Sequence, residues 1–178
     1  MRIVRGIYRS SARPDFHSPR QKREACAYPS DVTCKPRLAK SPDLPSWLEL
    51  VSEVEDLFGP MPDFEVHARR GIHRGTALVV ADGEQVHGAA LLSRDGRPQH
   101  IRWLAVRGSA RGRGVGAALL AAILDRWSTD DVEVVTFTQG TTGGEAARRL
   151  YERFGFQCVG ATDPAPDGGR RDLYSLRR

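Results

Sequence analysis

The chain has 178 residues, of which 40% are hydrophobic, and it carries 27 Lys and Arg residues against 22 Asp and Glu residues. This composition excludes a wholly disordered or fibrous protein, and the length suits one domain with a short appendage. The longest apolar run, Ala117–Leu124, is much shorter than the roughly 18 residues of a transmembrane helix, which predicts a soluble protein.

The net charge of +5 comes from the N-terminal segment. Residues 1–42 contain 10 Lys and Arg residues against 3 Asp and Glu residues, whereas the rest contains 17 against 19. The segment is also rich in Pro and Ser, so we expect residues 1–44 to be a basic, disordered leader before a domain over residues 45–178. A transit peptide is an alternative, because the segment is rich in Arg and poor in acids. A start codon assigned too far upstream would give a similar segment.

Helices are expected first in the domain. Ser46, followed three residues later by Glu49, has the pattern of a capping box at the start of a helix. A shorter helix is expected over residues 63–70, ending at Gly71. Asp82-Gly83 lies between two apolar segments and is a hairpin signal.

Strands and helices then follow in an order that defines the fold class. Strands are expected over residues 76–81, 86–92, 100–106, 132–138, 156–160 and 170–176, and helices over 115–127 and 143–154. Alternation in the third strand predicts that His100, Arg102 and Leu104 share one face. The order predicts an α/β or α+β fold with a mixed sheet.

A glycine-rich turn, Arg-Gly-Arg-Gly-Val-Gly over residues 111–116, joins the third strand to an apolar helix. Glycines let a backbone approach a ligand, and the N-terminus of a helix attracts anions, so the turn suits a group such as pyrophosphate. A P-loop is excluded because no Lys-Ser or Lys-Thr pair follows the glycines. The spacing Gly112-x-Gly114-x-x-Ala117 fits a loose dinucleotide pattern, but the chain lacks the acidic residue and the second half that this fold needs.

Two segments resemble the signatures of a known family. Leu104-Ala105-Val106, followed after four residues by Arg111-x-x-Gly114-x-Gly116, resembles the acetyl-CoA signature of the GNAT superfamily of N-acetyltransferases. Residues 147–156, Ala-Arg-Arg-Leu-Tyr-Glu-Arg-Phe-Gly-Phe, resemble the second signature of that family. The resemblance covers residues 46–178 and implies a mixed, mostly antiparallel central sheet flanked by helices. The family's first strand has no clear counterpart, and Gly144 stands where the family often has Asn.

The resemblance also implies a binding site for acetyl-CoA as co-substrate, with no metal. Its backbone and side-chain contacts are expected from Leu104, Ala105, Val106, Arg111, Gly112, Arg113, Gly114, Val115, Gly116 and Ala117. The strand residues would hydrogen-bond the pantetheine arm, and the amides of the turn would hold the pyrophosphate.

Tyr151 and His100 are the expected catalytic residues. Tyr151 matches the family tyrosine that protonates the departing thiolate, although its spacing equally fits packing beside Ala147 and Phe154. His100 falls where some members carry a catalytic Glu, and an imidazole accepts protons near neutral pH. A solvent-exposed strand histidine is an equally good interpretation. Glu133 is a weaker candidate for the base.

The function implied is an N-acetyltransferase, an acyltransferase that moves an acetyl group from acetyl-CoA to a primary amine. The acceptor, a small molecule or a peptide, is not identified by the sequence. Acidic residues of the first helix would suit a cationic amine or form a solvated face: Glu49, Glu53, Glu55 and Asp56. A catalytically silent CoA-binding or sensing domain is the alternative, and a homodimer is left open.

A nucleic-acid-binding protein led by the basic segment is a third hypothesis, but no reader motif supports it. Cys26, Cys34 and Cys158 lack the spacing of a disulfide scaffold or of a metal site. The N-terminus lacks the apolar region of a secretion signal. We therefore expect free thiols in a reducing compartment and a cytoplasmic protein with no membrane partner.

Overall fold

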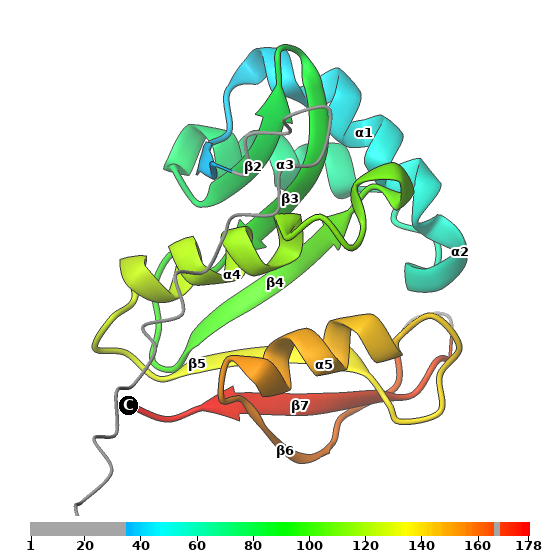
Figure 1. The fold of residues 1–178 in the computed structure, drawn as a ribbon, viewed down its shortest axis with the longest axis vertical. Coiled ribbons are helices and arrows are strands. Elements are labelled where there is room, and N and C mark those ends of the chain that lie inside the picture. The colour runs from blue at the N-terminus through cyan, green and yellow to red at the C-terminus, as the bar shows by residue number, and fades with distance from the viewer. Residues whose placement is uncertain (1–34, 166–167) are drawn as a thin grey trace, which may run out of the picture. The chain divides into compact units, whose positions relative to one another are not determined.

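The computed structural model describes residues 35–165 and 168–178. Within them, seven strands form one sheet in the order β1-β2-β3-β4-β5-β7-β6 (Figure 1). The strands are β1 (Arg37–Leu38), β2 (Ala77–Asp82), β3 (Gln85–Leu92), β4 (Gln99–Val106), β5 (Val132–Phe137), β6 (Gln157–Ala161) and β7 (Arg171–Leu176). The helices are α1 (Leu44–Glu53), α2 (Glu55–Phe58), α3 (Phe64–Arg74), α4 (Val115–Arg126) and α5 (Glu145–Arg153), with short 3-10 turns η1 (Ser41–Asp43) and η2 (Gly108–Ala110).

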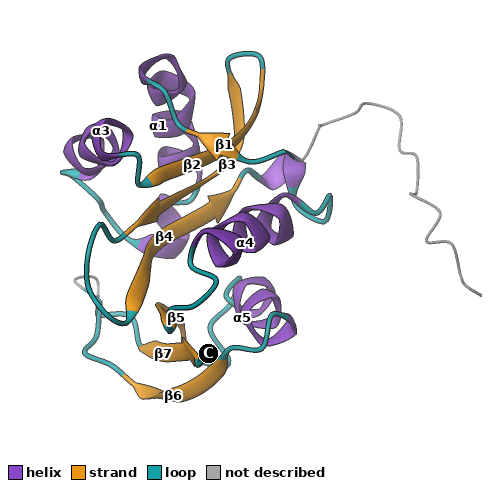
Figure 2. Ribbon diagram, turned by 90° about the vertical axis from the view of Figure 1, so that its left-hand side faces the viewer, coloured by secondary structure: helices purple, strands orange, loops and turns teal. Residues whose placement is uncertain are grey.

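The sheet is mixed and mostly antiparallel, as the sequence predicts. Only the β4–β5 pair is parallel among the paired strands of the described chain. Helices α4 and α5 cover one face, and α1 and α3 cover the other face over β2 to β4 (Figure 2). Each face of the sheet has its own apolar core. In one core, the side chains of Leu119, Leu120 and Ile123 of α4 are fully buried against the sheet. In the other, Trp47 and Leu50 of α1 are fully buried.

Helix α1 begins three residues earlier than its sequence suggests, with Asp43 and not Ser46 at the N-cap position. It starts at Leu44 and carries Pro45 in its first turn, where a missing N–H costs nothing. The capping box expected at Ser46 is therefore wrong. The Ser46 Oγ instead accepts a hydrogen bond of 3.0 Å from the Val86 N–H of β3.

Helix α3 continues past Gly71, where the sequence predicts its end. It extends to Arg74, and Gly75 closes it with a left-handed φ of 64°. Gly71 is buried inside the helix, where a Cβ would lie 2.6 Å from Leu91 Cδ2. The glycine therefore allows α3 to pack closely on the sheet instead of ending the helix.

The sheet does not lack its first strand. β1 pairs with β2 at the edge of the sheet, although it lies within the segment expected as the leader. The Arg37 guanidinium donates two hydrogen bonds of 2.7 Å to the Asp43 carboxylate, which also accepts one from the Lys40 N–H. These contacts connect β1 to the start of α1. Residues 1–34 of the expected leader lie outside the described residues.

Candidate active site

Strands β4 and β5 separate partway along their length. They pair in parallel only from Gln99 with Val132 to Ile101 with Val134. Beyond Ile101, β4 continues to pair with β3, while β5 continues beside β7 (Figure 1). The backbone edge of β4 after Ile101 therefore has no strand partner on the β5 side.

A β-bulge lies at the point of separation. β3 pairs Leu91 with Trp103 but Leu92 with Ile101, so Arg102 is the extra residue of β4. The bulge shifts the alternation: Ile101 packs in the α4 core with Leu104, whereas Trp103 packs in the α1 core. The prediction that His100, Arg102 and Leu104 share a face is therefore wrong, because the alternation assumed a regular strand.

The glycine turn borders a cavity of about 560 Å³, which we call the turn cavity. Nine of the ten residues expected to contact the cofactor line this cavity, and Arg113 is the exception. The cavity is also lined by residues that the sequence did not predict, from α2, from α5 and from the position between α1 and α2. These residues are Val54, Leu57, Phe58, Ala146, Ala147, Arg149, Leu150 and Arg153.

The backbone of the turn requires glycine at two positions. Gly112 and Gly114 have φ angles of 74° and 84°, which side chains other than glycine rarely adopt. No heavy atom lies within 4 Å of where a Cβ of either residue would be, so this part of the turn is open. Gly114 directly precedes α4, whose first N–H groups have no partner within the helix. The turn thus presents N–H groups and a helix N-terminus to the same cavity.

Gly116 has a different role, because it lets α4 approach α5. A Cβ on Gly116 would lie 3.2 Å from Leu150 Cδ2. Such a contact is tighter than a normal van der Waals distance, so the Leu150 side chain would have to shift to admit a larger residue. The close approach brings one side of α5 next to the first turn of α4.

Acidic residues of α1 hold the loop that follows β4. The N–H of Gly108 donates to Glu53 Oε1, and the Arg107 guanidinium lies 3.5 Å from Glu53 Oε2 and 3.4 Å from Glu49 Oε2. Arg107 also donates to the carbonyl groups of Val86 and Ser46. Glu49 and Glu53, considered above as partners for a cationic amine, therefore contact the loop that carries the glycine turn.

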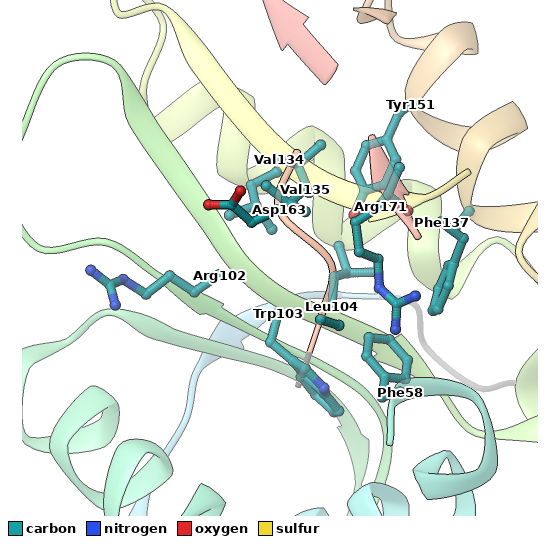
Figure 3. A pocket seen from close by; sticks show the side chains of 14 residues that line it. Phe58, Arg102, Trp103, Leu104, Val134, Val135, Phe137, Tyr151, Asp163 and Arg171 are labelled. Atoms are coloured by element: carbon teal, nitrogen blue, oxygen red, sulfur yellow. The ribbon is translucent and has the colours of Figure 1, made fainter. Parts of the chain in front are cut away.

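A second cavity, of about 240 Å³, lies between the separating strands, and we call it the strand cavity (Figure 3). Four residues line both cavities: Phe58, Leu104, Phe137 and Ala147. The two cavities therefore adjoin at these residues. In Figure 3, Tyr151 and Phe137 lie on one side of the strand cavity and Arg102 lies on the other.

Tyr151 lines the strand cavity from α5. Its ring makes an edge contact with Phe156, with 5.5 Å between the ring centroids, and only 4% of the residue is exposed. Burial raises the pKa of the Tyr151 phenol well above its ordinary value of 10.0. The phenol therefore stays protonated at neutral pH and can act only as a proton donor there.

His100 lies where β4 and β5 are still paired, next to the point at which they separate. Its side chain is 47% exposed, and Nδ1 lies 3.9 Å from Oε2 of Glu133, its neighbour on β5. Glu133 Oε1 also accepts a hydrogen bond from Arg177. Neither His100 nor Glu133 is among the residues that line the strand cavity or the turn cavity.

Charged residues that the sequence analysis did not single out also line the strand cavity. Arg171 lies over the Phe137 ring, 4.7 Å from its centroid, and Asp163 comes from the loop after β6. The pairing of β5 with β7 places Arg171 opposite Phe137. No local pattern signals these residues, because a long-range strand pair brings them to the site.

Gly144, where the family often has Asn, is tightly packed. A Cβ there would lie 2.5 Å from Phe137 Cβ, a distance that atoms cannot adopt without a shift of the backbone. An Asn therefore does not fit beside Phe137 in this chain. The close approach of the start of α5 to the end of β5 therefore requires glycine at position 144.

Membrane-spanning helices and clusters of metal ligands are both absent from the described residues. None of their helices combines the length and the apolar character needed to span a bilayer. Their His, Cys, Asp and Glu side chains form no group of three or more suited to hold a metal ion.

Comparison with known proteins agrees with this geometry. Residues 73–158 match the family model described as an acetyltransferase (GNAT) domain. No curated protein matches the sequence significantly. The resemblance to the GNAT family inferred from the two signatures is therefore confirmed.

Several solved structures share the fold. A GNAT family acetyltransferase from Bacillus cereus is 17% identical, with a TM-score of 0.63 over 81% of this chain and 96% of that one. Ard1 from Thermoplasma volcanium is 19% identical, with a TM-score of 0.65 over 80% and 95%. Arabidopsis thaliana Naa50, solved with the bisubstrate analogue CoA-Ac-MVNAL, is 18% identical, with a TM-score of 0.59 over 81% and 98%.

Proposed function

We propose that the protein is an N-acetyltransferase that moves the acetyl group of acetyl-CoA to a primary amine by direct attack. The observation that carries this proposal is the pair of adjoining cavities. One is bordered by an anion-binding turn at a helix N-terminus, and the other contains a buried, protonated tyrosine. A donor in the first cavity and an acceptor in the second would meet beside Leu104 and Ala147.

The turn cavity would bind the donor through the backbone. N–H groups from Gly112 to Ala117 would hold the pyrophosphate, because the turn is open and the dipole of α4 favours negative charge. The edge of β4 from Leu104 to Val106, which has no β5 partner, would hydrogen-bond the pantetheine arm. The residues present therefore fit acetyl-CoA.

The strand cavity would admit the amine. Nitrogen attacks the carbonyl carbon of the thioester, the carbon–sulfur bond breaks, and the sulfur takes a proton from the Tyr151 hydroxyl. Since burial keeps this phenol protonated, it is suited to the role of acid. Two related structures support an amine acceptor, since Naa50 was solved with the bisubstrate analogue CoA-Ac-MVNAL and the NatC complex was solved with Gag peptide and CoA.

The amine must lose a proton, and His100 is our candidate for the base. Because His100 lies outside the lining of both cavities, it would act through a water molecule. Its Nδ1 lies 3.9 Å from Oε2 of Glu133.

An acceptor screen tests the proposal. Purified full-length protein is incubated with acetyl-CoA and amino acids, peptides with free N-termini, polyamines or aminoglycosides, and free thiol release is measured. Transfer to at least one class, with the acetylated amine identified by mass spectrometry, is the expected result. CoA binding without transfer to any class would favour the silent CoA-binding domain instead.

A further inference from the structure

Helix α5 presents two arginines to the turn cavity that the proposed chemistry does not use. Arg149 and Arg153 are one helical turn apart, and both line the cavity together with Ala146 and Leu150 of the same helix face. Both arginines are exposed, so a dissolved ligand can reach them.

Neither arginine has an acidic partner within residues 35–165 and 168–178. The one hydrogen bond of Arg149 runs from Nε to the Glu145 carbonyl over 3.5 Å, and it leaves the rest of the guanidinium unengaged. The adjacent Arg148 differs, because its Nη1 donates to the Thr138 carbonyl over 2.9 Å and holds the loop after β5. The face of α5 toward the turn cavity thus carries uncompensated positive charge.

This charge lies beside the glycine turn but is separate from it. Leu150, between the two arginines in sequence, sits against Gly116 in the first turn of α4. The turn has its own anion-binding groups in the backbone N–H groups and the helix N-terminus. The cavity therefore offers two anion positions on neighbouring helices, one built from backbone and one from guanidinium groups.

CoA carries two separate anionic groups that match these positions, a pyrophosphate and a phosphate monoester on the 3′ carbon of its ribose. Guanidinium groups bind phosphate oxygens through paired hydrogen bonds. We propose that Arg149 and Arg153 bind the 3′-phosphate of CoA, so that the protein selects free CoA thioesters over phosphopantetheine thioesters such as those of acyl carrier proteins. This inference rests on the proposed donor site.

Calorimetry of the full-length protein with CoA and with 3′-dephospho-CoA tests the inference without relying on activity. We expect CoA to bind about tenfold more tightly than 3′-dephospho-CoA, because two exposed guanidinium groups would contact the additional phosphate. This preference for CoA should become smaller as salt is added, since salt screens exposed charges. The double variant Arg149→Ala/Arg153→Ala should bind both ligands equally. Arg126→Ala, which removes an exposed arginine at the far end of α4, is the matched control and should keep the preference.

The outcomes separate this inference from the function on which it rests. Equal binding of the two ligands by the wild-type protein would overturn the 3′-phosphate site and leave the acetyl-CoA site intact. A preference that survives in the double variant, or is lost in Arg126→Ala, would also overturn the assignment to these two residues. Failure of the wild-type protein to bind CoA at all would overturn the donor site itself.

Discussion

The Gly108 N–H donates a hydrogen bond of 2.5 Å to Oε1 of Glu53, which connects the end of α1 to the loop between β4 and α4. A Cβ on Gly108 would lie 2.9 Å from the same oxygen, so a side chain there would displace the Glu53 carboxylate. Since the loop leads directly to the glycine turn, this contact positions the proposed pyrophosphate site from a helix on the other face of the sheet.

Replacing Glu53 with Ala should loosen the turn. We expect a loss of about 1–2 kcal/mol in the free energy of unfolding, because the Gly108 N–H loses a charged acceptor. CoA affinity, measured by calorimetry, should fall several-fold. Glu49→Ala is the control, since Glu49 contacts Arg107 from an exposed position at 3.4 Å and should matter little. Equal effects of the two variants on CoA affinity would contradict a specific role for the Gly108 contact.

Gly114→Ala and Gly75→Ala form a matched pair. Both glycines have positive φ, at 84° and 64°, and neither has a heavy atom within 4 Å of the Cβ position. Each substitution should therefore cost about 1–2 kcal/mol of stability through backbone strain alone. Only Gly114→Ala should also weaken CoA binding, because its methyl group would enter the turn cavity. The CoA affinities of the two variants are compared by calorimetry at a temperature below both melting temperatures. An unchanged CoA affinity in Gly114→Ala would show that the turn is not part of the binding site.

Tyr151→Phe should lower kcat by about 10²-fold or more while leaving the affinity for acetyl-CoA unchanged, because the hydroxyl acts only as the thiolate leaves. The ring contact with Phe156 survives, so the protein should fold. Tyr174→Phe removes another buried phenol, which donates to Glu152 and lines neither cavity, and should be nearly as active as wild type.

The pH dependence gives an independent check on Tyr151. Burial raises the pKa of its phenol above 10.0, so the proton is retained throughout the neutral range. The wild-type kcat should therefore show no decrease due to this group between pH 7 and about 10. A falling limb in that interval that disappears in Tyr151→Phe would mean that the phenol ionises much more easily than its burial implies.

His100→Ala tests the proposed base. The variant should lower kcat/KM by about 10²-fold, because no side chain at this position could then accept the amine proton through a water molecule. His73→Ala, which replaces an exposed histidine at the end of α3, is the control and should keep the wild-type kcat/KM. A wild-type kcat/KM in His100→Ala would contradict the assignment of His100 as the base.

Asp43→Asn should destabilise the protein at neutral pH. Burial raises the pKa of Asp43, but the hydrogen bonds from Arg37 and Lys40 have the larger combined effect, so its pKa lies below the ordinary value. A lowered folded-state pKa stabilises the fold above the unfolded pKa of about 3.9, and this stability is lost as the pH falls through the folded value. Urea unfolding should show a difference of about 1–3 kcal/mol at pH 7 that shrinks in acid.

Much of the architecture follows from local patterns. The strands from β2 to β7 lie within two residues of their expected positions, because apolar residues within them and turn-forming residues between them mark most of the boundaries. β1 could not be predicted in this way, since two residues carry no periodicity. The bulge at Arg102 was also not visible in the sequence, because the register of β4 depends on its pairing with β3.

The glycine turn, the apolar helix after it and the helical spacing of Arg149 and Arg153 can be predicted from local patterns, since each depends on residues within a few positions of one another. Which residues share the cavities depends instead on tertiary contacts. Tyr151 is buried because α5 packs beside β5, and Arg171 reaches the strand cavity because β7 pairs with β5. Glu53 of α1 reaches Gly108, in the loop that leads to the glycine turn, from 55 residues away in the chain. Such contacts depend on how the layers pack, and local backbone preferences carry no information about them.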